Sequence, residues 1–241
     1  MLHWSDEALI LSVRPHGETA AVVDLLTRKH GRYGGLVYGG RSRRLRPVLQ
    51  IGNRVDAAWQ ARLADHLGTV AVELRRGYAA EAMEDPRALA GLTALCTLAG
   101  LLPERDPHRN VFEIALVVFD HLDAAAVWPA LYVRWEAALL SELGFGLDLA
   151  SCAATGSAEN LIYVSPKSGR AVSAEAGAPY ADRLLQLPRF LTGETPSAVT
   201  PADIEAGFAL TGYFLSKRVF DPLGLAMPEA RSRLATRLAS T

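Results

Sequence analysis

The stretch Lys29-His-Gly-Arg-Tyr-Gly-Gly-Leu-Val-Tyr38 contains the pattern that decides the fold of the amino-terminal part of the chain. Its first four residues have the chemistry of a turn, and the apolar residues after them have the length of one strand. Similar apolar runs, separated by turn residues, lie on both sides of it. Together they predict five strands, at residues 8–13, 19–27, 33–38, 54–62 and 69–74.

Residues 1–77 are therefore expected to form one small β domain. Five short strands in about 70 residues are typical of a closed OB-fold barrel, a shape that often binds single-stranded nucleic acid. An SH3-like barrel would produce a similar pattern, so both alternatives stay open at this point.

Beyond residue 78 the apolar residues change to helical spacing. Helices are predicted over residues 86–102, 110–122 and 128–143, after the capping residue Thr200, and after Pro228. Residues 145–180 interrupt them with a predicted hairpin that turns at Lys167-Ser-Gly169. The chain is thus expected to be an α+β protein, with an OB-fold domain over residues 1–77 and a helical domain over residues 78–241.

Four arginines fall within six residues at Arg41-Ser-Arg-Arg-Leu-Arg46, although the net charge of the whole chain is only −1. Residues 1–77 hold 12 Lys/Arg against 7 Asp/Glu, whereas the remainder holds 13 against 19. A basic first part and an acidic second part indicate a nucleic-acid partner for the first and a different partner for the second. The alternative for the arginines is a solvated turn.

Guanidinium groups bind phosphates through paired hydrogen bonds and also stack on bases. We therefore predict a nucleic-acid-binding surface formed by Arg14, Arg28, Lys29, Arg32, Arg41, Arg43, Arg44, Arg46, Arg54 and Arg62, which Arg75 and Arg76 would extend. Three aromatic side chains, Tyr33, Tyr38 and Trp59, are candidates for base stacking. The alternative for each of them is a place in the barrel core.

Common catalytic patterns are missing from the sequence. It contains no phosphate-binding Walker loop and no Gly-x-Ser-x-Gly motif, and its six histidines show no paired ligand spacing. The chain has two cysteines, no stretch of 18 uninterrupted apolar residues, and an amino terminus unlike a signal peptide. We expect a protein of a reducing cytoplasm that is not an enzyme, needs no cofactor and does not span a membrane.

The predicted hairpin carries the spacing of a zinc ribbon without its ligands. Two C-x-x-C knuckles would require cysteines at four positions, which are occupied by Cys152, Thr155, Ser173 and Ala176. Structural zinc requires four thiolate or imidazole ligands. We therefore predict that this region holds no metal.

These features together resemble the RecO family of bacterial recombination-mediator proteins, over nearly the whole chain. The residues that carry the resemblance are Glu18-Thr-Ala-Ala-Val-Val23, Gly31-Arg-Tyr-Gly-Gly-Leu-Val-Tyr-Gly-Gly-Arg-Ser-Arg-Arg44, Trp135-Glu-Ala-Ala-Leu-Leu-Ser-Glu-Leu-Gly-Phe-Gly-Leu-Asp-Leu-Ala-Ser-Cys152 and Tyr163-Val-Ser-Pro-Lys-Ser-Gly-Arg-Ala-Val172. Their order and spacing make the match specific.

The resemblance implies an OB domain, a helical body and an inserted zinc-ribbon-like element. It also implies binding of single- and double-stranded DNA, annealing of complementary strands, and action in the bacterial cytoplasm at the nucleoid. The implied protein partners are RecR, the tail of the single-strand-binding protein and, indirectly, the RecA recombinase.

A helical body of this kind could bind a partner peptide in a groove between its helices. Candidate residues for holding acidic groups of such a peptide are Arg109, Arg134, Lys217 and Arg218. Two other functions stay open from the sequence. One is a scaffold whose basic barrel binds an acidic protein, and the other is a metal-dependent nucleic-acid enzyme, for which clustered ligands are missing.

Overall fold

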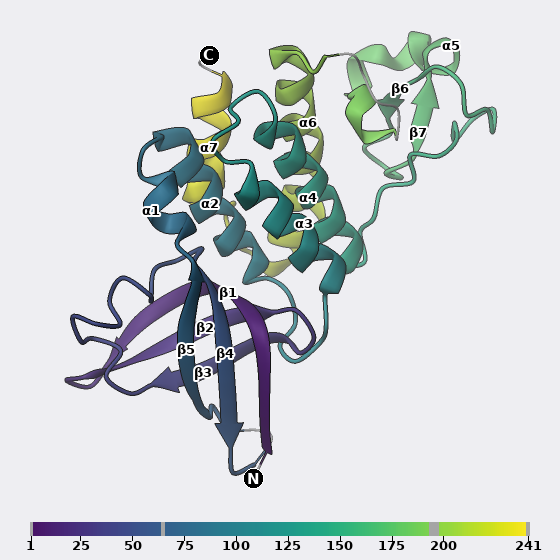
Figure 1. Cartoon of the computed structure of the whole chain (residues 1–241). Helices are drawn as coiled ribbons and strands as arrows, with labels where there is room; N and C mark the ends of the chain where they lie inside the picture. Colours follow the sequence, from purple (N-terminus) through teal and green to yellow (C-terminus); the bar gives the residue numbers. More distant parts are fainter. Residues whose placement is uncertain (1, 64–65, 193–197, 240–241) are drawn as a thin grey trace. The chain divides into compact units, whose positions relative to one another are not determined.

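A computed structural model of the chain describes residues 2–63, 66–192 and 198–239 (Figure 1). The chain divides into two compact units, residues 1–123 and 124–241, and each is described here by itself. Within the described ranges, no helix combines the length and the apolar character that a membrane crossing needs.

The first unit begins with a closed five-stranded barrel. Its strands are β1 (Leu2–His16), β2 (Ala20–Thr27), β3 (Gly31–Val37), β4 (Arg54–Ala61) and β5 (Thr69–Arg76). They are ordered β1-β2-β3-β5-β4, and β4 pairs back onto β1. All neighbours are antiparallel except β3 and β5, which are parallel where Leu36 lies opposite Thr69. This arrangement confirms the predicted OB-like barrel and the α+β class.

The barrel core follows the two-residue period of its strands. Along β4, Val55, Ala57 and Trp59 point inward, and the residues between them face solvent. The connection between β3 and β4, residues 38–53, covers the core with Leu45, Val48 and Leu49. We call this connection the arginine loop, because it contains Arg41, Arg43, Arg44 and Arg46.

Three helices complete the first unit: α1 (Tyr78–Ala82), α2 (Pro86–Ala99) and α3 (Arg109–Asp120). The predictions of α2 and α3 are confirmed, and α1 was not predicted as a separate helix. The Asn53 side chain ties α1 to the barrel, because its Oδ1 accepts a hydrogen bond from the Ala79 N–H at 3.1 Å. These helices therefore belong to the same compact unit as the barrel. That residues 1–77 form a domain by themselves stays a prediction.

The second unit contains helices and a small sheet. The helices are α4 (Trp128–Glu142), α5 (Ala174–Gly177), α6 (Pro201–Phe214), which continues as a π-helix over Leu215–Phe220, and α7 (Glu229–Ala239). The strands β6 (Leu161–Val164), β7 (Ala171–Ser173) and β8 (Leu185–Gln186) pair in the order β7-β6-β8. The short helical turns are Ala178–Arg183, Arg189–Leu191 and Asp221–Leu223.

Three local predictions for this unit are confirmed. The hairpin of β6 and β7 turns at Gly169, which has φ +71°. Gly144 has φ +85° directly after the end of α4, as expected for a left-handed cap. Thr200 caps α6. Its hydroxyl accepts a hydrogen bond from the Asp203 N–H, and the Asp203 carboxylate accepts one from the Thr200 N–H.

Candidate nucleic-acid interface

The arginine loop is held against the turn between β1 and β2. The Arg41 N–H donates to the carbonyl of Thr19 at 3.0 Å, and its guanidinium donates to the carbonyl of Gly17 at 2.9 Å. Within the loop, helical-type hydrogen bonds join Arg46 to Ser42 and Leu49 to Leu45. Leu45, Val48 and Leu49 anchor the loop on the barrel core, whereas Arg43, Arg44 and Arg46 are exposed.

The four arginines of this loop are all exposed. Among the residues that the structure describes, no carboxylate forms an ion pair with any of them, and the partner of their guanidiniums there is the carbonyl of Gly17, which accepts from Arg41. Arg14 is exposed as well, near the end of β1 that leads into the adjoining turn. Cationic groups that are hydrated rather than paired can exchange water and counterions for phosphates.

A cavity of about 550 Å³ lies beside the arginine loop. Tyr38 and Arg44 of the loop line it together with residues of the strands, among them Trp4 and Gln60. Tyr38 is 72% exposed, so its ring is accessible to an unstacked base. Of the three aromatic stacking candidates, it is the one that solvent reaches freely.

The other two aromatic candidates belong to the barrel core. Trp59 is 3% exposed, and its indole N–H donates to the carbonyls of Gly34 and Leu67. Tyr33 packs edge-on against Trp59, with ring centroids 5.2 Å apart. Trp4, which sequence reasoning missed, stacks on Trp59 at 5.7 Å. Trp4 is followed by the polar residues Ser5 and Asp6, so no apolar run in the sequence indicated that it belongs to a strand.

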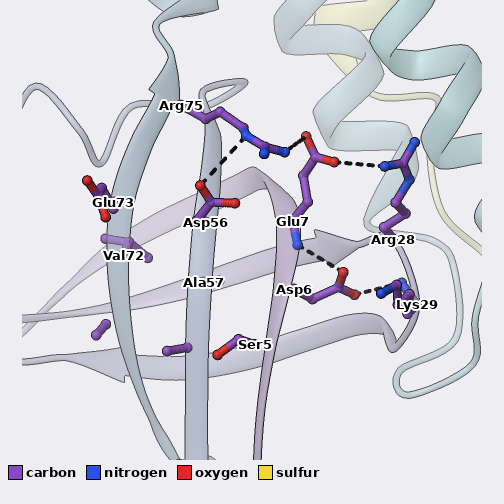
Figure 2. A pocket seen from close by; sticks show the side chains of 12 residues that line it. Ser5, Asp6, Glu7, Arg28, Lys29, Asp56, Ala57, Val72, Glu73 and Arg75 are labelled. Atoms are coloured by element: carbon purple, nitrogen blue, oxygen red, sulfur yellow. Dashed lines mark hydrogen bonds and ion pairs between the residues drawn. The ribbon is translucent and has the colours of Figure 1, made fainter.

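A second group of predicted cations is bound to carboxylates of the protein itself (Figure 2). Glu7 of β1 is only 6% exposed. Its carboxylate forms ion pairs with Arg28 at 3.1 Å, with Arg75 at 2.7 Å and with Arg54. Arg28 also pairs with Glu113 of α3 at 2.6 Å. We call these five residues the Glu7 network.

The Glu7 network keeps its acids ionised. Burial acts to raise the pKa of Glu7, but hydrogen bonds from Arg54 and Arg75 outweigh it and hold that pKa below its usual value. A hydrogen bond from Arg28 lowers the pKa of Glu113 in the same way. At neutral pH the arginines of the network therefore face full negative charges.

Arg32 is engaged in a similar way. Its guanidinium pairs with Asp24 at 2.7 Å and donates to the carbonyl of Leu102 at 2.8 Å. Arg76 pairs with Glu81 and Asp120. The structure thus separates the predicted cations, since Arg28, Arg32 and Arg54 pair with carboxylates of the protein, whereas no described carboxylate pairs with those of the arginine loop.

Lys29 and Arg62 are the remaining cations of the predicted set. Both are exposed, Lys29 in the turn between β2 and β3 and Arg62 directly after β4. The backbone N–H of Lys29 donates to Asp6 at 2.7 Å. Their contact with nucleic acid stays a prediction, and both lie outside the arginine loop in the sequence.

A cavity of about 630 Å³ lies next to the Glu7 network. Figure 2 shows the side chains that line it. Side chains of both signs line it, with Asp56 and Glu73 on one side and Arg28 and Lys29 on the other. Small residues such as Ala57 form its floor. Because the charges largely cancel, this cavity lacks the single sign of charge that favours a polyanion.

The hairpin region brings the four zinc-knuckle positions together around one thiol. The Ser173 N–H donates to Sγ of the buried Cys152 at 3.3 Å, and the Ser173 hydroxyl accepts from the Ala176 N–H at 3.4 Å. Burial acts to raise the pKa of Cys152, but hydrogen bonds with Ser173 and Thr155 lower it to about 6. One thiol, two hydroxyls and a methyl group do not fit tetrahedral zinc. Across the described ranges, no group of three or more His, Cys, Asp or Glu could hold a metal ion.

The four residues predicted to hold an acidic peptide each contact different partners in the described structure. Arg109 belongs to the first unit and lies 3.5 Å from Glu113. In the second unit, Arg134 donates to the carbonyl of Phe190, Lys217 pairs with Asp221, and Arg218 donates to the carbonyl of Lys167. Their role in peptide binding stays a prediction.

Comparisons with known proteins agree with the sequence resemblance. The family model "Recombination protein O N terminal" matches residues 1–78, and "Recombination protein O C terminal" matches residues 83–225. A protein of Methylobacterium nodulans named DNA repair protein RecO is 56% identical over 95% of each chain. Proteins of the same name from Rhodospirillum centenum and Beijerinckia indica are 54% and 49% identical, over 98% and 100% of this chain and 94% and 96% of their own lengths.

Proposed function

Because this chain belongs to the RecO family of DNA repair proteins, we propose that it binds DNA through the arginine loop and anneals complementary strands. The observation that carries this proposal is the set of four exposed guanidiniums at Arg41, Arg43, Arg44 and Arg46, to which no described carboxylate is paired. Arg14 is exposed near the end of β1 that leads into the turn contacted by the loop, and the accessible ring of Tyr38 belongs to the loop itself.

The proposed mechanism is electrostatic. Two single strands repel each other through their phosphates, and a cationic surface that binds both lowers this repulsion. The arginines of the loop hold the backbone, which carries no sequence information, so the bases stay free to find their complements. Such a protein acts by binding and positioning, and no bond of the DNA is broken.

The family also suggests protein partners. We propose that the chain works with RecR, recognises the acidic tail of the single-strand-binding protein, and so helps RecA to load onto coated single strands in the bacterial cytoplasm. Arg109, Arg134, Lys217 and Arg218 remain the candidates for the acidic tail. Support for these partners is the family membership alone.

The test is a fluorescence-anisotropy titration of a labelled single-stranded oligonucleotide at several salt concentrations. Four arginines in contact with phosphates predict a slope of log affinity against log salt of roughly −3. The variant Arg43→Ala/Arg44→Ala should reduce the magnitude of the slope by roughly 1.4, about equally for every sequence. It should also slow the annealing of two complementary labelled strands.

A matched control removes two exposed arginines from the second unit, Arg183→Ala/Arg189→Ala. This variant changes the net charge by the same amount but removes no residue of the proposed DNA surface, so it should leave the slope unchanged. An unaltered slope in the loop variant would reject the proposed DNA surface. If the chain ignores oligonucleotides even in dilute buffer, the barrel is instead a surface for an acidic protein.

A further inference from the structure

The last helix of the chain is attached by an exposed connection. All six residues from Asp221 to Ala226 are exposed, including the apolar side chains of Leu223 and Leu225. α7 begins three residues later, at Glu229. It therefore lies beyond residue 225, where the match to the family model ends.

Two side chains of α7 are buried in the second unit. Arg231 is 7% exposed and Leu234 is fully buried, whereas the other described side chains of this helix are exposed or half-buried. Residues three apart share one face of a helix. The two buried side chains of α7 thus have the spacing Arg-x-x-Leu, and one of them is an arginine.

The pocket that receives Arg231 is built by α4 and α6. The guanidinium donates to both carboxylate oxygens of Glu136, at 2.9 and 3.0 Å, and to the carbonyl of Phe208 at 2.7 Å. It also lies over the Phe208 ring, 5.3 Å from the centroid. Thr211 donates to the same carboxylate, and a side chain at Gly212 would collide with the guanidinium at 2.6 Å.

This pocket requires a guanidinium. Glu136 is 0% exposed, and a buried carboxylate without a cationic partner is strongly unfavourable. A lysine ammonium cannot satisfy both oxygens in the planar, forked manner of arginine. The acceptors lie within residues 83–225, which match the family model, whereas the arginine comes from outside them.

Next to this pocket, α6 and α7 leave a space between them. A cavity of about 330 Å³ remains beside Arg231, between Ile204 and Ala209 of α6 and Ala235 and Leu238 of α7. A helix with larger apolar side chains on this face would therefore find room for them.

We propose that the groove between α4 and α6 is a docking site for an amphipathic helix that carries Arg-x-x-Leu, and that α7 occupies it in cis. A partner helix of this chemistry binds when α7 leaves, and its arginine replaces Arg231 on Glu136. The exposed connection before α7 allows this exchange without disturbing the rest of the unit. The inference is independent of the proposed DNA binding.

The test uses the full chain with a protease site placed in the exposed residues Leu223–Ala226. After folding, the chain is cut, and a fluorescent peptide of residues 227–241 is added. We expect the peptide to replace the cut segment and to raise the anisotropy, and the uncut chain to bind it far more weakly. The Arg231→Ala peptide should bind roughly 100-fold more weakly, and the Arg231→Lys peptide should also be impaired.

Three results would overturn the proposal. Equal binding of the native and Arg231→Ala peptides would show that the arginine pocket does not select its occupant. A cut segment that never exchanges would show that α7 is not displaceable. Loss of helical circular dichroism on cutting would show that α7 is an essential part of the unit's core.

Discussion

The arginine loop and the Glu7 network contain the same type of side chain on the same barrel, yet they differ in what the guanidiniums face. Arg28, Arg54 and Arg75 converge on the carboxylate of Glu7. Arg43 and Arg44 face solvent. A cluster of basic residues is thus available to anions only where the fold does not pair it with acids.

The two regions also differ in how tightly they are built. Gly31, in the turn that holds Arg28 and Lys29, has φ +76°, and a Cβ there would lie 2.0 Å from the carbonyl oxygen of Asp106. Gly39, at the start of the arginine loop, has φ +65°, and a Cβ there would have no neighbouring atom within 4 Å. One region is closed by the helices of its own unit, and the other is open.

This difference predicts the largest effect for Gly31→Ala. The new methyl group would collide with backbone atoms in addition to the left-handed strain, so the free energy of unfolding should fall by about 3 kcal/mol or more. Gly39→Ala, the matched control, should cost only the backbone strain, about 1 kcal/mol. Urea unfolding followed by circular dichroism measures both. Equal losses would mean that the two regions do not differ in packing.

The next prediction removes the shared carboxylate. Glu7→Gln leaves three arginines without their common anion, and the half-buried Arg54 cannot regain full hydration. Removal of one partner of a buried pair costs about 3–5 kcal/mol. Because Arg28 and Arg75 still reach solvent, we expect a loss of about 2–3 kcal/mol in the free energy of unfolding. The same urea titration measures it.

The control for this variant is Glu73→Gln. Glu73 lines the same cavity but is exposed, so its loss should change the free energy of unfolding by less than about 0.5 kcal/mol. DNA affinity of the folded Glu7→Gln protein should equal that of the native chain. A gain in DNA affinity would show that the arginines of the Glu7 network can bind DNA once Glu7 no longer pairs with them, and that their role is not confined to stabilising the fold.

Much of the fold could be predicted because its signals are local. Turn residues and apolar runs located the five strands, and the sequence around Thr200 located the start of α6. The exception is β1, which extends from Leu2 to His16 rather than over residues 8–13. Its first residues pair with β4, but Leu2 and Trp4 stand among polar residues there, so they form no apolar run.

The candidate site was predictable only in part, because ion pairs join residues far apart in the chain. Arg28 and Glu113 are 85 residues apart, and Arg231 and Glu136 are 95 apart. No local pattern indicates either pair. The arginine loop is different, since its four cations have no acidic residue among them and its exposure follows from the local sequence.

The smallest effect, and the sharpest comparison, comes from single arginines. Arg46→Ala removes one exposed cation of the arginine loop, so the slope of log affinity against log salt should fall in magnitude by roughly 0.7. Arg28→Ala removes the same charge from the Glu7 network, so that slope should not change. Because Arg28 is a third exposed, its loss should lower the free energy of unfolding by only about 1 kcal/mol.

Both variants have the same net charge, so any general effect of charge on the encounter with DNA is equal in the two. Anisotropy titrations with one labelled oligonucleotide over the same salt range, on samples shown by circular dichroism to be folded, isolate the contribution of position. If Arg28→Ala changes the slope as much as Arg46→Ala does, then Glu7 and Glu113 release this arginine to phosphates. Pairing with a carboxylate of the protein would then not keep a guanidinium from DNA, and the whole basic face of the barrel would have to be regarded as one DNA surface.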